Sequence, residues 1–136
     1  MPVNNLIKYK GYADVLVGVI LVFKPSLIYE SGLARLWGGL TGLRLSDAST
    51  APGFNHSLAC MTAAVGVGNV IASRCGPAAC PPVFYSSLTW GTLCLLTCIL
   101  TPQTMGLSSS TVLMSAINHL CFAGALVWTD TTVARL

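Results

Sequence analysis

Charged residues are scarce in this chain. They make up 8% of its 136 residues, whereas a soluble domain carries about 25%. So few charges could not cover a surface that faces water, and 54% of the residues are hydrophobic. The composition therefore argues against an ordinary water-soluble domain and favours one integral membrane domain over residues 1–136.

Motifs for nucleic acids, nucleotides and metals are also lacking. The formal net charge is only +3 and no basic run is present, so nucleic acid is not an expected partner. There is no G-x-G-x-x-G pattern and no P-loop to hold phosphates. The cysteine and histidine spacings match no metal pattern, although two His and an Asp leave a metal-dependent alternative open. We therefore expect no cofactor and no metal.

Proline is absent from the middle of four long apolar stretches. Each is long enough for a helix to cross a hydrocarbon core, which takes roughly 17–25 residues. They cover residues 6–29, 54–73, 82–101 and 107–128. The expected fold is all-α, a bundle of four transmembrane helices. In the second helix we expect small residues to form one packing face; they are Ala59, Ala63, Ala64 and Gly68.

The N-terminal stretch lacks a small-x-small cleavage site, and Asp14 interrupts its apolar run. We therefore expect a retained first helix rather than a cleaved signal peptide. Four spans place both termini on one side of the membrane. Lys8, Lys10, Arg74 and Arg135 flank the spans there, against Lys24, Arg35 and Arg44 opposite, which favours cytosolic termini.

The longest connection, from Glu30 to Gly53, contains an apolar stripe at helical spacing. The stripe consists of Leu33, Leu36, Trp37, Leu40 and Leu43. Between the first and second membrane helices we therefore expect an amphipathic segment at the membrane interface. A connection of this length serves either as a lid over a binding site or as a surface tether.

Six cysteines occur, and their spacing matches neither a thioredoxin-type C-x-x-C nor a zinc pattern. Four of them lie within the expected spans, where cysteine acts as a small hydrophobe. Cys75 and Cys80 lie in the second-to-third connection. They are free thiols if that loop faces the cytosol and able to pair if the topology is inverted.

Polar side chains within a span are costly and suggest a functional site. With a rise of ~1.5 Å per residue, depths can be matched across antiparallel helices. Asp14, Asn69 and His119 then fall in one layer, with Asn118 beside them. We predict that Asp14 and His119 are catalytic, as a proton donor and acceptor tuned by burial. Asn69 and Asn118 are predicted to hold a developing oxyanion or a water.

Ser115, one turn before His119, is expected to fix the tautomer of the ring. The alternative for the whole layer is structural. Asparagine and histidine also link membrane helices by hydrogen bonds worth ~0.6 kcal/mol each, and Asp14 could simply pair with Lys10, four residues earlier.

A second polar set lies toward the opposite side of the membrane, where the first helix ends and the second begins. We predict substrate binding by residues of this set and by Tyr85 of the third helix; they are Asn55, His56, Tyr85, Tyr29 and Glu30. For Asn55 a helix cap is the alternative, because asparagine is a favoured N-cap residue. For His56 contact with lipid headgroups is the alternative.

The stretches "GYADVLVGVILVFKPSLIY" and "APGFNHSLACMTAAVGVGN" resemble segments of small four-helix integral membrane proteins of filamentous fungi. Some of these proteins accompany secondary-metabolite biosynthesis. The resemblance implies an intracellular membrane, that of the endoplasmic reticulum, and a lipophilic terpenoid or polyketide intermediate as substrate. It assigns no catalytic residue.

Together these patterns predict a cofactor-independent membrane enzyme, an isomerase or a cyclase, that performs acid/base chemistry on a lipophilic substrate entering from the bilayer. The alternative is a non-catalytic membrane protein: an accessory subunit, a lipid-binding protein or a small transporter. The expected partners are the lipophilic substrate and membrane lipids. Four short helices make a small bundle, which leaves room for a homo-oligomer.

Overall fold

The computed structural model describes residues 2–101 and 103–135. Within them every regular element is helical, so the predicted all-α class is confirmed. The α-helices are α1 (Val3–Phe23), α2 (Ser26–Tyr29), α3 (Gly32–Thr41), α4 (Pro52–Ala72), α5 (Cys80–Leu100) and α6 (Ser110–Thr129). Short 3-10 turns lie between and after them: η1 (Ala48–Thr50), η2 (Pro77–Ala79), η3 (Gln103–Met105) and η4 (Thr131–Ala134).

The first long helix is shorter than expected. It ends at Phe23 rather than at residue 29, because Lys24 leaves the helical region with φ −151° and ψ 70°. Pro25 causes this break, since its ring disfavours a helical conformation of the preceding residue. The chain then restarts as the short helix α2. The other three long helices begin and end within three residues of the expected bounds.

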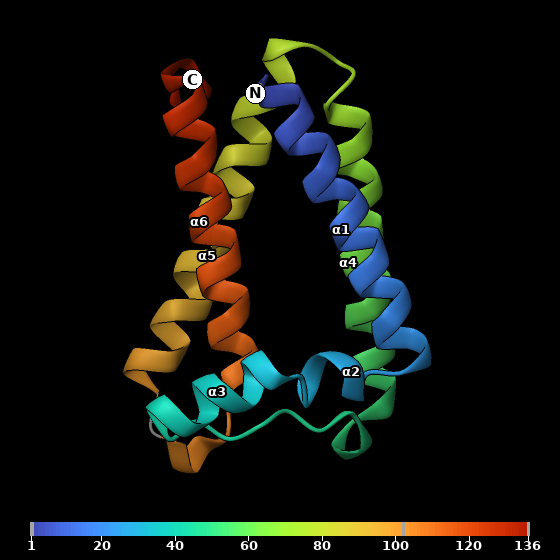
Figure 1. Ribbon diagram of the computed structural model, residues 1–136, viewed down its shortest axis with the longest axis vertical. Coiled ribbons are helices and arrows are strands. Elements are labelled where there is room, and N and C mark those ends of the chain that lie inside the picture. The colour runs from blue at the N-terminus through green and yellow to red at the C-terminus, as the bar shows by residue number, and fades with distance from the viewer. Residues whose placement is uncertain (1, 102, 136) are drawn as a thin grey trace.

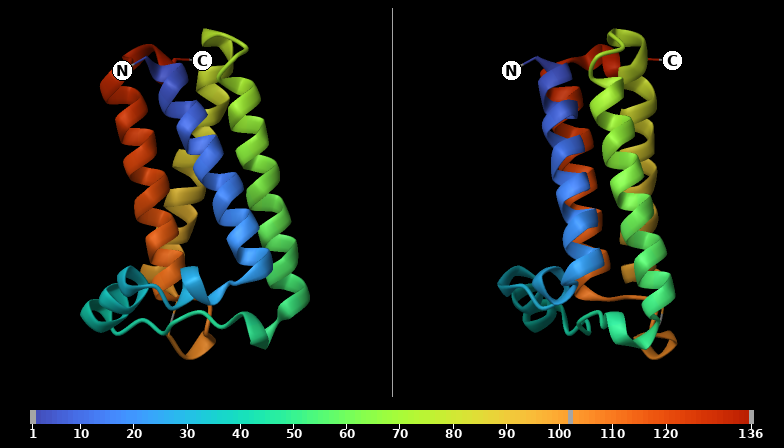
Figure 2. Two further views of the ribbon diagram at one scale, coloured as in Figure 1. Left: turned by 45° about the vertical axis from the view of Figure 1, so that its right-hand side comes forward. Right: turned by 90° about the vertical axis from the view of Figure 1, so that its right-hand side faces the viewer.

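The long helices form two antiparallel pairs, α1 with α4 and α5 with α6 (Figure 1). The pairs meet at the end of the molecule where both chain termini lie. A buried apolar cluster joins them there, and it includes Ile7, Val83, Phe84, Phe122, Ala123 and Leu126. Toward the other end the pairs diverge, and α2, α3 and the following loop run across that end (Figure 2).

Glycine lets α1 and α4 approach closely. A Cβ atom on Gly66 would lie 2.7 Å from the carbonyl oxygen of Gly11, and one on Gly18 would lie 2.8 Å from that of Ala59. Small residues at such contacts are typical of packed membrane helices. The predicted packing face is only half right: Ala59 and Ala63 face α1, whereas Ala64 and Gly68 are exposed.

Gly66→Ala is therefore expected to destabilise the protein by about 1–3 kcal/mol, because the added methyl group forces two backbones apart. Gly68→Ala, two residues further along α4, is the matched control: its Cβ would meet nothing within 4 Å. Thermal unfolding of both variants in one detergent measures the difference. Equal unfolding midpoints would show that α1 and α4 do not meet at Gly66.

The long connection contains the expected amphipathic helix, α3. It begins where the Ser31 side chain accepts a hydrogen bond from the Ala34 amide at 3.2 Å, and it ends at Gly42 with φ 71°. Ala34 is fully buried, and α3 packs against α6. Three leucines of its stripe, Leu33, Leu36 and Leu40, are more than half exposed, whereas Leu43, beyond the end of α3, is buried. That apolar face is therefore available to a membrane interface.

Two helical segments are long and apolar enough to cross a membrane, Pro77–Leu100 and Ser110–Thr129. Less than a third of each is buried, so neither resembles the core helix of a soluble protein. Large apolar side chains are also widely exposed, among them Phe23, Phe54, Leu100 and Trp128. Apolar surface of this extent marks contact with a membrane or with other proteins.

Candidate functional site

Asp14 is buried where α1 packs against α4. Only 7% of the residue is exposed, and Asn69 of α4, 8% exposed, donates a hydrogen bond from Nδ2 to its Oδ2 at 3.3 Å. Lys10, one turn earlier on α1, forms an ion pair with Asp14 Oδ1. The Lys10 and Asp14 side chains are 8% and 10% exposed, so this pair is shielded from the surroundings.

Lys10 extends from α1 toward the other helix pair. Its ammonium nitrogen lies 5.7 Å from the centre of the Phe122 ring on α6, within the range of a cation–π contact. His119 is three residues before Phe122 on α6, which places it on a neighbouring part of the same helix surface. His119 therefore lies about one turn of α6 from the ring that Lys10 contacts.

His119 is half-buried, and its Nδ1 atom is fully buried. Within the described ranges Nδ1 has no hydrogen-bond partner. The expected contact with Ser115 does not form, because Ser115 Oγ accepts a hydrogen bond from Trp90 Nε1 of α5 at 2.9 Å. The Trp90 ring itself lies beside His119, with 6.2 Å between the ring centres. An imidazole nitrogen is therefore held inside the protein without a partner.

We call Lys10, Asp14, Asn69 and His119 the polar layer. It comprises an ammonium, a carboxylate, an amide and an imidazole from three helices, next to the apolar cluster that joins the two pairs. A buried, unpaired imidazole nitrogen can accept or donate a proton. A neighbouring ammonium can stabilise a negative charge that develops on a substrate oxygen.

Asn118 lies at the level of the polar layer, but its side chain does not belong to it. The side chain is exposed, and it takes part in no hydrogen bond among the described residues. The reason is geometric, since successive helical residues point about 100° apart. His119 faces inward, and so its neighbour faces outward.

Tyr85 also lies apart from the polar layer. Its hydroxyl donates a hydrogen bond to the Ala134 carbonyl at 2.9 Å, which ties α5 to the C-terminal turn η4. Its ring meets Phe84 edge-on, with 5.0 Å between the ring centres. In this position Tyr85 closes the terminal end of the bundle.

Asn55 joins two neighbouring elements instead of capping α4. Its Oδ1 accepts a hydrogen bond from the Tyr29 hydroxyl, and its Nδ2 donates to the Leu21 carbonyl at 3.2 Å. The capping alternative was wrong, because α4 already begins at Pro52. Burial raises the pKa of Tyr29, so this hydroxyl keeps its proton and remains a donor.

The other residues of the second polar set do not converge on the contact between Asn55 and Tyr29. His56 is exposed. Glu30 pairs with Arg35 at 3.2 Å on the surface. Tyr29 and Glu30 do line one side of an open hollow of about 430 Å³ between the end of α1, α2 and η1. Asp47 lies on its other side, where hydrogen bonds from Ser49 lower the pKa of the carboxyl group.

Neither this hollow nor a second one beside η4 is lined by Asp14, Asn69 or His119. The six cysteines carry free thiols, including Cys75 and Cys80. Among residues 2–101 and 103–135, no group of three or more His, Cys, Asp or Glu side chains could hold a metal ion.

From the sequence, Lys10 was expected only as a possible partner of Asp14, and no role was expected for Trp90. The spacing of four residues between Lys10 and Asp14 is the signal for their pairing. The contact of Lys10 with the second helix pair has no such signal. Trp90 reads from the sequence as an ordinary apolar residue of a span.

Comparison of the chain with protein-family models, with curated proteins and with solved structures gives no match.

Proposed function

We propose that the chain is a four-helix integral membrane enzyme, an isomerase or cyclase that needs no cofactor. The helices α1 and α4 are as long as α5, 21 residues each, enough for about 30 Å of hydrocarbon. The two charges nearest the middle of α1, Lys10 and Asp14, would oppose its insertion, and they are paired inside the protein. In this arrangement α3 lies at the interface.

One observation carries the enzymatic proposal: the unpartnered Nδ1 of His119 beside the Lys10–Asp14 pair. A histidine that served only to link helices would use its nitrogens for that purpose. In an isomerisation, the imidazole takes a proton from a carbon next to a substrate carbonyl and returns it at another carbon. In a cyclisation, it takes the proton that is released as the ring closes and returns it to another atom of the substrate, so the composition does not change. Neither reaction consumes a cofactor.

The other residues of the polar layer have supporting roles in this proposal. The Lys10 ammonium stabilises the negative charge that develops on the carbonyl oxygen. Asp14 holds Lys10 in place through their ion pair, and Asn69 orients Asp14. In this proposal a lipophilic substrate reaches the polar layer from the bilayer. The resemblance to fungal membrane proteins suggests a terpenoid or polyketide intermediate and the endoplasmic reticulum.

A non-catalytic role is the second candidate, as an accessory subunit, a lipid-binding protein or a small transporter. The observation that favours it is the mutual satisfaction of Lys10, Asp14 and Asn69, which together neutralise and hydrogen-bond one another. In this view the three residues only hold α1 against α4.

The two candidates are separated by expressing the chain in microsomes and supplying lipophilic terpenoid and polyketide intermediates without added cofactors. The enzyme converts one of them to an isomeric product of unchanged mass, because isomerisation and cyclisation only move atoms within the substrate. Binding without conversion across the panel would favour the non-catalytic candidate.

A further inference from the structure

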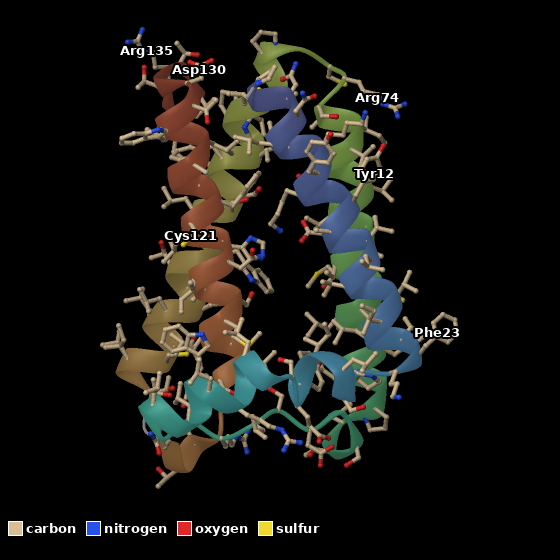
Figure 3. All side chains as sticks on the ribbon, viewed as in Figure 1. Tyr12, Phe23, Arg74, Cys121, Asp130 and Arg135 are labelled. Atoms are coloured by element: carbon tan, nitrogen blue, oxygen red, sulfur yellow. The ribbon has the colours of Figure 1, made fainter. Side chains whose placement is uncertain are left out.

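One face of α6 is turned away from the rest of the protein and carries a regular stripe of side chains. Successive members are four, three, four and three residues apart: Met114, Asn118, Cys121, Ala125 and Trp128. Figure 3 shows Cys121 on the side of α6 remote from α1 and α4. The buried residues of α6, such as Ala116 and Leu126, lie on its other side.

Asn118 is the unusual member of this stripe. It lies near the middle of Ser110–Thr129, one of the segments able to cross a membrane, and it is exposed. No hydrogen bond to its side chain is found in the described part of the chain. In hydrocarbon a carboxamide without partners is strongly disfavoured. The exposed amide therefore indicates a partner outside this chain.

A second copy of the chain satisfies this amide. The carboxamide contains both a donor and an acceptor, so two of them related by a two-fold axis bond reciprocally. The spacing of four and three residues is that of two helices packed at a small left-handed angle. Cys121 and Ala125 are small enough for close approach, and a Cβ on the adjacent Gly124 would meet nothing within 4 Å.

We propose that two copies of the chain pair in the membrane through the outer face of α6, with the Asn118 side chains hydrogen-bonded to each other. This interface shares no residue with the polar layer, so it stands whether or not the protein is an enzyme. It leaves α1 and α4 at the outside of the dimer.

Cys121 makes the interface directly measurable. In membranes containing a variant whose only cysteine is Cys121, copper phenanthroline is expected to produce a disulfide-linked dimer. The matched control has Cys60 as its only cysteine; that residue is also exposed but lies on α4. It should give little dimer. Equal cross-linking through Cys60, or none through Cys121, would overturn the proposal.

The role of the amide is tested in the same Cys121 background. Asn118→Leu is expected to weaken dimerisation about 5–30-fold, as loss of an interhelical amide hydrogen bond in a membrane does. Asn118→Gln keeps the amide and should retain most of the cross-linking. Because the side chain is exposed, neither change disturbs packing within the chain. A dimer that persists equally in the leucine variant would refute the amide contact.

Discussion

Asp14→Ala is expected to destabilise the folded protein by about 3–5 kcal/mol, because it leaves the charge of Lys10 buried without a partner. It also removes the acceptor of the Asn69 amide. Asp14 and Asn69 lie where α1 packs against α4, so the variant weakens the packing between these two helices. Thermal unfolding in detergent, followed by circular dichroism, measures it.

The exposed pair of Glu30 and Arg35 provides the control. Their side chains are 54% and 64% exposed, and such surface pairs contribute about 0–1 kcal/mol. Glu30→Ala should therefore leave the unfolding midpoint almost unchanged. Replacing both Lys10 and Asp14 by apolar residues should restore much of the stability lost in Asp14→Ala. Similar midpoints for Asp14→Ala and Glu30→Ala would mean that Asp14 is solvated rather than buried.

His119→Ala is expected to reduce turnover by about 10²–10⁴-fold, the usual contribution of a positioned acid or base. The Michaelis constant should change much less, because the imidazole acts on the proton and not on the apolar body of the substrate. Initial rates in microsomes, normalised to the amount of folded protein, give this comparison. Some loss of stability is expected, because the variant removes the ring that lies beside Trp90, although Nδ1 forms no hydrogen bond that would be lost.

The second histidine makes this test specific. His56 is exposed near the start of α4, remote from the polar layer. A loss of turnover confined to His56→Ala would move the chemistry to the start of α4 and contradict the proposed site. Unchanged turnover in His119→Ala would remove the acid/base role altogether.

Matching depths across antiparallel helices predicted which residues share a level of the bundle. Asp14 and Asn69 are the clearest case, since the level was calculated from helical rise alone and they form a hydrogen bond. Depth does not determine rotation about the helix axis. Asn118 and His119 lie at the same level, but only His119 faces inward. The apolar residues around them gave too little amphipathic contrast to decide between the two.

The limits of local patterns appear in the small-residue face and in the first helix. Ala63 and Ala64 are chemically alike, and only contact with Gly18 distinguishes the packed one. The break at Lys24 could have been predicted from Pro25, because the proline rule is local. The contact of Lys10 with Phe122 joins α1 to α6 across more than a hundred residues, and no pattern within either helix specifies it.

The proposed function requires that the polar layer lies within the hydrocarbon region. Trp90 reports on this directly, because its ring lies 6.2 Å from that of His119. In a variant with Trp37→Phe and Trp128→Phe, Trp90 is the sole tryptophan. In vesicles, phospholipids brominated deep in their acyl chains should quench its fluorescence most strongly, and iodide in the water should quench it little. Efficient quenching by iodide with none by the brominated lipids would contradict the account.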